Sequence, residues 1–410
     1  QGLRDQSIFS NYGSTLKDLG KLQEAEIFTR KAIKIEPNSA EINYNLGNIL
    51  KLLRKLKEAE FFTRKAIEMN DKFENSHLNL GIILRDLGKP EDAIPSFLKA
   101  IELNPDCVMT KLYLEDVIQK TVPRWHISMI NDQERNNAYL KAINLAIKNK
   151  DYVLEIGTGS GLLSMMAIDA GAKKVITCES NKSISKIASK IISKNGYKDK
   201  IRVINKKSTE LTIGNDLSQK ADLIISEIFS SNLVGEGVQA TILDAKKRLL
   251  KSNGKLLPES GEIKFALIKG NSELEEQCFT SEINGYDLSD FNQITGKKFN
   301  IHIKGLNSSF LSNDNSAFSF DFYGNEEIKE KEKTIDIPVI KSGTCIGIQT
   351  WIKINVYQNI YLENKPSNTK KSHWSNPIYR FKKPLKLSKG EILKVKASIL
   401  KDNVWFELIE

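Results

Sequence analysis

A 34-residue periodicity near the start of the chain constrains its fold more than any other feature of the sequence. Small and aliphatic residues recur at this interval through three successive repeats. The matching columns are Gly13, Gly47 and Gly81; Ala25, Ala59 and Ala93; Ala32, Ala66 and Ala100; and Ile33, Ile67 and Ile101. Small residues at fixed offsets let two antiparallel helices pack closely. Pro37 and Pro105 stand between repeats, where a proline ends the second helix of a pair.

The pattern resembles the tetratricopeptide repeat, a 34-residue helical hairpin that stacks into a solenoid. It predicts repeats at residues 6–39, 40–73 and 74–107, with a capping helix at 108–120. The expected domain is therefore an α-helical solenoid at residues 1–120. Modules of this kind bind protein or peptide partners on their concave face, so the resemblance implies recruitment of a partner or substrate. Docking within the same chain is the alternative, and the concave positions do not by themselves name a ligand class.

Composition limits the remaining possibilities. A chain of 410 residues with 40% hydrophobic and 27% charged residues is expected to form two or three globular domains. Because no apolar run approaches the roughly 18 residues of a membrane span, we expect no membrane segment. The four cysteines and four histidines are scattered without metal-ligand spacing, which predicts no metal site and favours a reducing, cytoplasmic setting. The chain begins at Gln1 rather than methionine, so we expect it to be trimmed or processed.

The net charge of +10 raises the question of nucleic-acid binding. Lysine outnumbers arginine by 51 to 10, whereas base-reading and bidentate phosphate sites favour arginine. The lysines are also spread along the chain. We therefore expect no nucleic-acid partner, while the charge remains compatible with an acidic partner.

A strand, a glycine loop and a helix follow one another in the middle of the chain. The apolar run 152–156 predicts a strand, and residues 162–169 predict a helix. Between them stand Gly157, Gly159 and Gly161, whose freedom of backbone conformation allows a tight turn and close approach to a ligand. The order is that of a doubly wound, Rossmann-like α/β domain, which we expect at residues 121–258 with further strands at 175–178, 201–205 and 221–226.

Acidic residues around this loop favour S-adenosylmethionine over a dinucleotide as the cofactor. Glu179, at the end of the second strand, is placed to accept hydrogen bonds from a ribose diol. Glu155, just before the loop, would repel a pyrophosphate but suit a cationic ligand. The glycines alternate as GxGxG, and the Gly-Lys-Ser/Thr of a phosphate loop is missing. Ser208-Thr209-Glu210 follows the third strand, where we expect an adenine contact, with Glu210 among the cofactor-binding residues.

Two further carboxylates, Glu227 and Glu236, lie nine residues apart after the strand at 221–226. The segment between them has neither helical nor strand periodicity, so it predicts a loop at the carboxyl end of the sheet, where doubly wound proteins bind ligands. Two carboxylates facing one pocket form a fork that can hold a planar guanidinium.

These motifs together resemble the protein arginine methyltransferases. SEIFSSNLVGEG, which contains Glu227 and Glu236, is similar to that family's double-glutamate loop, and VLEIGTGSG to its cofactor loop. WHISMINDQER resembles the amino-terminal segment that closes over the cofactor. Met129 and Arg135 in it match the family's methionine, which packs on the cofactor, and its arginine, which pairs with the cofactor carboxylate.

The resemblance extends to the end of the chain, covering about residues 122–410. Ser372-His373-Trp374 is similar to the family's Thr-His-Trp loop, which implies a substrate-binding role for Trp374. The loop with glycines on both sides of Glu236 is most similar to the type III enzymes and to the repeat-bearing member of animals. The paired-tyrosine motif of type I enzymes is missing from residues 116–120, and those two relatives carry two catalytic modules where this chain has one.

The mechanism that the resemblance implies needs no metal. The two glutamates would localise positive charge on one guanidino nitrogen and orient the other toward the sulfonium methyl. His373 is the expected proton acceptor, since Asp132 matches the aspartate that pairs with this histidine in the family. Proton transfer to either glutamate is the alternative.

After residue 258 the pattern changes to short alternating strands, at 262–268, 301–303, 317–322, 346–356, 391–399 and 404–409. It predicts a β-barrel-like substrate domain at residues 259–410. Residues 272–297 interrupt the strands with an acidic helical stretch. They lie where the family carries a dimerisation arm, so the resemblance implies a homodimer, with a monomer as the alternative.

The sequence thus predicts a multidomain enzyme that transfers a methyl group from S-adenosylmethionine to arginine in a protein substrate, releasing S-adenosylhomocysteine. A small guanidino compound as acceptor and a scaffold without turnover are the alternatives. The target protein and the choice between mono- and dimethylation stay open.

Overall fold

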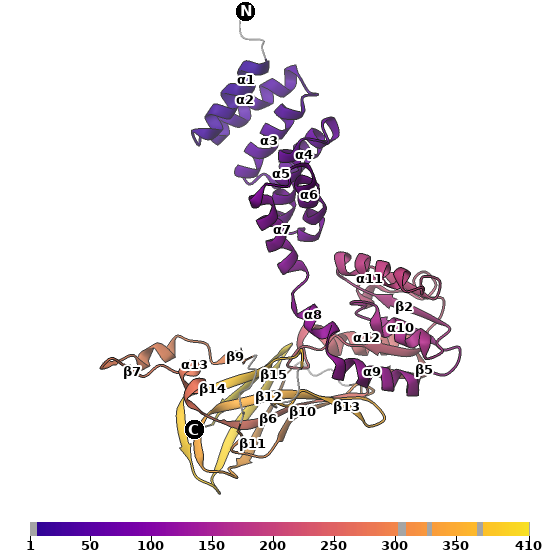
Figure 1. The fold of residues 1–410 in the computed structure, drawn as a ribbon, viewed down its shortest axis with the longest axis vertical. Coiled ribbons are helices and arrows are strands. Elements are labelled where there is room, and N and C mark those ends of the chain that lie inside the picture. The colour runs from indigo at the N-terminus through magenta and orange to yellow at the C-terminus, as the bar shows by residue number, and fades with distance from the viewer. Residues whose placement is uncertain (1–5, 302–308, 326–329, 367–371, 410) are drawn as a thin grey trace, which may run out of the picture. The chain divides into compact units, whose positions relative to one another are not determined.

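The computed structural model describes residues 6–301, 309–325, 330–366 and 372–409. The chain separates into two compact units, residues 1–124 and 125–410 (Figure 1). The predicted division at residue 258 lies inside the second unit, where one hydrophobic core includes residues from both sides of it, such as Val153 and Phe406. That division therefore stays a prediction.

The first unit, the repeat unit, is a series of antiparallel helix pairs, as the period predicts. Its helices are α1 (Gln6–Asp18), α2 (Leu22–Ile35), α3 (Ala40–Leu52), α4 (Leu56–Met69), α5 (Glu74–Asp86), α6 (Pro90–Leu103) and α7 (Val108–Thr121). Each predicted repeat contains one pair, and α7 is the predicted capping helix.

The columns of small residues are the contact points of the helix pairs. All six alanines of the two alanine columns are fully buried. A Cβ added at Gly13 or Gly47 would collide with Thr29 or Thr63 of the following helix. The repeat spacing therefore exists because any larger side chain at these positions would force the paired helices apart.

The second unit begins with the short helix α8 (Trp125–Ile130) and with α9 (Gln133–Ala146), and continues into a five-stranded parallel sheet. Its strands and intervening helices are β1 (Tyr152–Ile156), α10 (Leu162–Asp169), β2 (Lys174–Cys178), α11 (Lys182–Lys194), β3 (Ile201–Ile204), β4 (Ala221–Ser226), α12 (Val238–Leu249) and β5 (Leu250–Leu257). All five residues of β1 are buried, which is why that strand reads as a continuous apolar run interrupted only by Glu155.

The strand order explains where a ligand can bind. The order is β3-β2-β1-β4-β5, so the chain moves outward from β1 to β3 and then returns to place β4 on the other side of β1. The loops after β1 and β4 therefore leave their strands in opposite directions and open a crevice between them. The predicted glycine loop follows β1, and the predicted glutamate loop follows β4.

The rest of the described chain is rich in antiparallel strands, most of which belong to two sheets. One contains β6 (Ser260–Lys269), β9 (Lys298–Ile301), β10 (Asn315–Asp321), β12 (Gly343–Tyr357), β13 (Ile360–Glu363) and β14 (Asn376–Leu387). The other contains β11 (Glu330–Pro338), β15 (Ile392–Leu400) and β16 (Asn403–Leu408). The β-rich character is as predicted, and the closed barrel stays a prediction. Of the predicted strand 301–303, residues 302 and 303 lie outside the described part of the chain.

Residues 272–297, the arm, leave the sheet between β6 and β9. The arm contains α13 (Ser272–Cys278), the hairpin of β7 (Glu282–Ile283) and β8 (Tyr286–Asp287), and the 3-10 helix η3 (Ser289–Gln293). Figure 1 shows it extending away from the strands of the β-rich part. Among the described residues, every helix is too short or too polar to span a bilayer.

Candidate active site

The glycine loop after β1 has the backbone conformation that its sequence predicts. Gly157, Gly159 and Gly161 have φ angles of +84°, +51° and +81°, a region that disfavours side chains with a Cβ. The N–H groups of Gly157 and Thr158 donate to the carbonyl of Cys178 at 3.0 and 3.1 Å. These bonds tie the loop to the end of β2.

Glu179 lies at the tip of β2, directly against this loop. Its carboxylate accepts hydrogen bonds from the backbone N–H groups of Gly159 at 3.3 Å and Asn181 at 2.9 Å. Since the side chain is only half-buried, it keeps acceptor capacity toward the crevice. Its role as the ribose contact stays a prediction.

Glu155 differs from the expectation that it faces a cationic ligand. Its side chain is buried beneath the loop, with the residue 1% exposed, and it accepts a hydrogen bond from Ser164. Burial raises the pKa of Glu155 to about 7, despite hydrogen bonds from Ser164 and Thr177 that favour the charged form. The carboxyl group therefore supports the loop from within the protein.

Glu210, the expected adenine contact, lies in the 3-10 helix η1 (Ser208–Glu210) after β3. It is exposed, and its carboxylate accepts a hydrogen bond from the Lys207 backbone N–H at 3.4 Å. In the described structure this side chain closes its own turn and forms no hydrogen bond or ion pair with the glycine loop.

The glutamate loop begins at Glu227, immediately after β4. Because Ile156 of β1 and Ser226 of β4 are paired in register, Glu227 and Gly157 follow adjacent strand ends. A Cβ added at Gly157 would lie 2.6 Å from Cγ2 of Ile228. The first glycine of the cofactor loop is thus also the contact point of the glutamate loop.

The second predicted carboxylate, Glu236, belongs to the 3-10 helix η2 (Gly235–Gly237) ahead of α12. Ser230 and Asn232 shape the chain before it by accepting hydrogen bonds from the Gly235 N–H, each at 3.1 Å. The Glu236 side chain lies outside what the structure describes, so its convergence on Glu227 stays a prediction.

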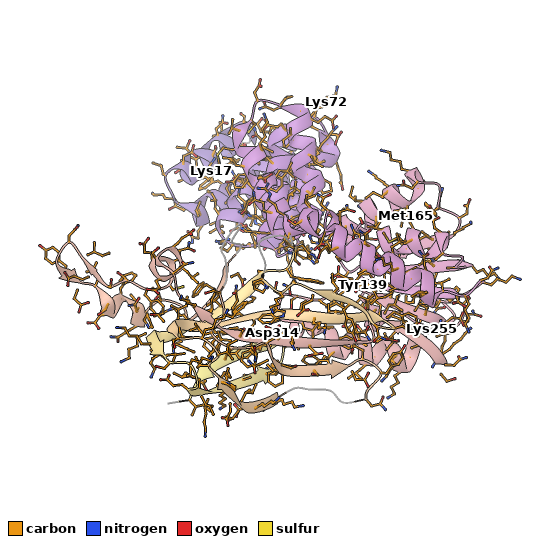
Figure 2. All side chains as sticks on the ribbon, turned by 60° about the horizontal axis from the view of Figure 1, so that its bottom comes forward. Lys17, Lys72, Tyr139, Met165, Lys255 and Asp314 are labelled. Atoms are coloured by element: carbon orange, nitrogen blue, oxygen red, sulfur yellow. The ribbon has the colours of Figure 1, made fainter. Side chains whose placement is uncertain are left out.

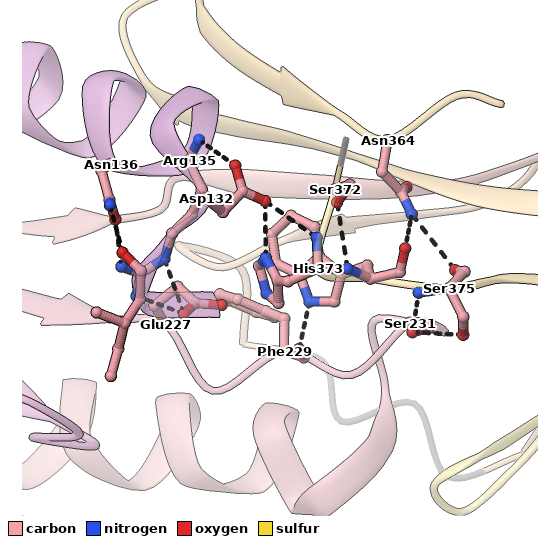
Figure 3. Close-up of polar contacts among 12 residues, drawn as sticks. Asp132, Arg135, Asn136, Glu227, Phe229, Ser231, Asn364, Ser372, His373 and Ser375 are labelled. Atoms are coloured by element: carbon pink, nitrogen blue, oxygen red, sulfur yellow. Dashed lines mark hydrogen bonds and ion pairs between the residues drawn. The ribbon is translucent and has the colours of Figure 1, made fainter. Parts of the chain in front are cut away.

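Glu227 is bound to an arginine of the same chain. Nε and Nη2 of Arg135 donate to its Oε2 at 3.1 and 2.5 Å, and both side chains are buried (Figure 3). The sequence predicted that Arg135 would pair with the cofactor carboxylate, whereas here its guanidinium lies on Glu227. The site therefore demonstrates that this carboxylate can hold a guanidinium in a desolvated environment.

Asp132 and His373 form a second buried pair beside the first. Nδ1 of His373 lies 2.9 Å from Oδ2 of Asp132, which also accepts the His373 backbone N–H at 3.1 Å (Figure 3). The other oxygen of Asp132 caps α9 by accepting the Arg135 N–H at 3.0 Å. Burial alone would raise the pKa of Asp132, but these hydrogen bonds outweigh it and hold the pKa below its ordinary value.

Trp374 differs from its expected role as a substrate contact. It is buried, and its Nε1 donates to the carbonyl of Phe229 at 2.8 Å. The Ser375 N–H and hydroxyl both bond to the Ser231 hydroxyl at 3.0 Å. Trp374 and Ser375 thus hold the glutamate loop in place.

Sequence reasoning missed Tyr139 of α9, which lies under the site (labelled in Figure 2). Its hydroxyl donates to the carbonyl of Ser226 at 3.0 Å, and the Arg135 guanidinium lies 5.5 Å from its ring centroid. A fully buried tyrosine with this partner anchors α9 to the end of β4. No motif in the sequence singled out this residue.

Family models match both the methyltransferase-like part of the chain and its repeats. Residues 136–272 match the model of ribosomal protein L11 methyltransferase (PrmA). Tetratricopeptide-repeat models match residues 7–39, 28–61 and 75–107. The first and last of these begin within one residue of the predicted repeats.

Curated relatives match about seven-tenths of the chain. The chain is 33% identical over 281 residues to an arginine N(omega)-methyltransferase of Streptomyces achromogenes subsp. streptozoticus, covering 68% of this chain and 77% of that protein. It is 27% identical over 321 residues to protein arginine N-methyltransferase 7 of Xenopus laevis, covering 72% of this chain and 47% of that one. The chain thus spans about half the length of this animal relative.

Solved structures share the fold. The Trypanosoma brucei PRMT1 enzyme–prozyme heterotetrameric complex with AdoHcy matches with a TM-score of 0.62 at 21% identity, covering 71% of this chain and 93% of that one. Protein arginine methyltransferase 10 of Arabidopsis thaliana matches with a TM-score of 0.57 at 19% identity, covering 68% and 88%. With its loop, carboxylates and histidine arranged as described, and with a relative this similar over most of its length, the chain belongs to the arginine N-methyltransferase family and carries tetratricopeptide repeats ahead of the methyltransferase fold.

Proposed function

We propose that the chain transfers the methyl group of S-adenosylmethionine to a guanidino nitrogen of arginine in a protein substrate. The observation that carries this proposal is the buried Glu227 carboxylate, which holds a guanidinium at the strand end next to the glycine loop. Family membership supports the reaction class, and S-adenosylhomocysteine is the expected product.

The residues around the glycine loop fit the cofactor. At Gly159 an added Cβ would meet only the Met129 methyl carbon within 4 Å, at 3.8 Å, so the loop borders a space that a ligand can enter. Glu179 would accept the ribose hydroxyls, and Met129 would pack on the ligand. The guanidinium of Arg135 pairs with Glu227 in this structure. We expect it also to pair with the carboxylate of the bound cofactor. Glu155 and Glu210 stay proposed cofactor residues because of their places in the sequence, before the glycine loop and after β3.

The bound cofactor supplies an electrophilic methyl group on a sulfonium. Glu227, with Glu236 as its proposed partner, would hold the substrate guanidinium and leave one nitrogen oriented toward that methyl. A nitrogen–carbon bond forms as the carbon–sulfur bond breaks, and the methylated group sheds one proton. Since Asp132 keeps Nδ1 of His373 protonated, Nε2 is the basic nitrogen left to accept that proton.

Free arginine is a second candidate acceptor. The Streptomyces relative is named for arginine rather than for a protein, and it is 33% identical to this chain. A free amino acid and an arginine within a peptide present the same guanidinium, so Glu227 alone does not distinguish them.

The test incubates the purified chain with labelled S-adenosylmethionine and one of three acceptors, and measures the label transferred to each. The acceptors are arginine-rich peptides, lysine-substituted copies of them, and free L-arginine. Label on the arginine peptides alone supports the proposal, and mass fragments identify mono- or dimethylation. Label on free arginine alone replaces it with the second candidate. Label on none of them while S-adenosylhomocysteine binds contradicts both.

We also propose that the repeat unit recruits a protein partner and that the enzyme is cytoplasmic and needs no metal. The four cysteines are free thiols, which suits a reducing compartment. Among the described residues, no group of three or more histidine, cysteine and acidic side chains is arranged to hold a metal ion.

The arm supports a proposed homodimer. Five large apolar side chains on it are exposed, which is unusual for a surface without a partner. They are Ile283, Tyr286, Leu288, Phe291 and Ile294.

Phe291→Asp on the arm is expected to convert the dimer into a monomer, because a charge would be buried in an apolar contact. Sedimentation at micromolar concentration measures the change. Ile392→Asp is the matched control, since Ile392 is equally exposed but lies on β15 outside the arm. A wild-type chain that sediments as a monomer would exclude the homodimer.

A further inference from the structure

A buried glycine stands in a central strand of the larger antiparallel sheet. Gly261 of β6 pairs with Phe320 of β10 on one side and with Ile354 of β12 on the other. Glycine weakens a strand, because it is conformationally free and has no side chain to pack. A glycine at such a position indicates that another part of the chain approaches the strand closely.

The part of the chain that approaches Gly261 is Leu233 of the glutamate loop. A Cβ added at Gly261 would lie 2.7 Å from Cδ2 and 3.1 Å from Cδ1 of Leu233. Both distances are shorter than the roughly 3.5–4.0 Å at which carbon atoms pack. Leu233 is 1% exposed and belongs to the same core as Ile263 and Phe320. The missing side chain at residue 261 therefore leaves the space that Leu233 fills.

Leu233 also has a backbone conformation that is rare for a leucine. Its φ angle is +66°, in the left-handed region where a Cβ crowds the following carbonyl oxygen. Its N–H donates to the carbonyl of Ser230 at 2.9 Å, so the chain turns at this residue. Gly237, on the other side of Glu236, has a φ angle of +68°. Two left-handed residues therefore set the path of the backbone on either side of Glu236.

The two residues reach this conformation in different ways. Gly237 has no Cβ, so its positive φ angle carries no steric cost. Leu233 does carry that cost, and such a residue persists only where the surrounding structure holds it. The contact with Gly261 supplies the hold, because a change of φ at Leu233 would turn its side chain out of the space above the glycine.

We propose that Leu233 is a positioning residue for methyl transfer, because its contact with Gly261 fixes the turn that leads to Glu236. The proposal rests on the proposed function, in which Glu236 helps Glu227 to hold the acceptor guanidinium. Glu227 directly follows β4 and is paired with Arg135, so its place is set at the strand end. The place of Glu236 depends on the path of the loop, which the turn at Leu233 determines.

A leucine that only filled the core would behave differently when replaced. Its loss would lower the free energy of unfolding and leave the turnover of the folded enzyme unchanged. Loss of a positioning residue lowers the turnover of the folded enzyme. The affinity for S-adenosylhomocysteine should stay the same, because neither the glycine loop nor Glu179 is altered.

Leu233→Ile and Leu233→Met separate the backbone requirement from the filling of space. Isoleucine has the volume of leucine, but its branched Cβ strongly disfavours a positive φ angle. Methionine is unbranched at Cβ and adapts to the same space, so it is the matched control. We expect Leu233→Ile to lower kcat by at least about tenfold, and Leu233→Met to stay within about threefold of wild type.

Gly261→Ala tests the other side of the contact. The added methyl group overlaps Cδ2 of Leu233, so the leucine has to move and the turn moves with it. We expect this variant to lose at least about tenfold in kcat. Leu233→Ala removes the atoms that collide. In the Leu233→Ala background, Gly261→Ala is therefore expected to change kcat by less than about threefold.

Hydrogen exchange followed by mass spectrometry supplies a measurement that does not depend on turnover. Residues 228–238 are expected to exchange faster in Leu233→Ile and in Gly261→Ala, because the turn is no longer held. Residues 157–161 of the glycine loop should exchange as in wild type. Calorimetric titration with S-adenosylhomocysteine, well below the melting temperature of each variant, should give an affinity within about twofold of wild type.

Equal kcat values for Leu233→Ile and Leu233→Met would overturn the proposal. So would an equal effect of Gly261→Ala in the wild-type and Leu233→Ala backgrounds, or a loss of S-adenosylhomocysteine binding that accompanies the loss of kcat. A wild-type chain that methylates no arginine acceptor contradicts the proposed function alone. Hydrogen exchange then still decides whether Leu233 holds the loop, since unchanged exchange of residues 228–238 in both variants would show that it does not.

Discussion

A Glu227→Gln enzyme is expected to transfer methyl groups at least about a thousandfold more slowly than the wild type. Glutamine preserves the shape of the side chain but removes the negative charge that holds a guanidinium at the end of β4. Binding of S-adenosylhomocysteine should remain measurable, because the glycine loop and Glu179 are untouched. Single-turnover transfer to an arginine peptide and calorimetric titration of S-adenosylhomocysteine measure the two properties separately.

The substitution also removes the partner of a buried arginine. Arg135 and Glu227 are both nearly inaccessible, so an unpaired Arg135 is expected to lower thermal stability. Assays must therefore be made well below the melting temperature of the variant. Glu407→Gln makes the same chemical change at an exposed position on β16 and should leave transfer unaltered. Wild-type turnover by Glu227→Gln would refute the guanidinium-holding role.

Asp132→Asn is expected to lower kcat by about a hundredfold or more while changing KM little. An ionised Asp132 can only accept, so Nδ1 of His373 must carry the proton and Nε2 is left basic. An asparagine amide can donate to Nδ1 instead, which would place the proton on Nε2 and remove the acceptor. Asp199→Asn, at an exposed turn, is the control.

The same variant has a predictable effect on stability against pH. The pKa of Asp132 is lowered in the folded state, so its ionised form stabilises the fold at pH values above its unfolded pKa of about 4. That contribution is lost as the pH falls through the lowered folded value. Wild type should therefore be more stable than Asp132→Asn at neutral pH, and the difference should disappear in acid. If the free energies of unfolding of wild type and Asp132→Asn differed by the same amount down to low pH, the charge of Asp132 would not be what stabilises the fold.

Local features of the sequence predicted most of the regular structure. Strand β1, helix α10 and strand β4 begin and end where their patterns predict, because buried parallel strands and their helices differ sharply in apolar content from the turns between them. The repeat helices follow from a period that recurs three times. Strand β14 was missed because Pro377 and Pro384 argue against a strand. Between Arg380 and Leu385 the pairing with β12 is interrupted by a register shift, which accommodates Pro384.

The sequence by itself determined the kinds of groups at the site, and the tertiary structure decided which of them meet. Glycines, carboxylates and a histidine in family order were enough to predict the chemistry. The pairing of Arg135 with Glu227 joins residues 92 positions apart, that of Asp132 with His373 joins residues 241 apart, and Trp374 reaches Phe229 over 145. No local pattern specifies such contacts. They depend on the return of β4 to the side of β1 and on the antiparallel strands that carry His373 back to α9. For the same reason, only the folded chain shows that Glu155 is buried and that Trp374 supports the glutamate loop.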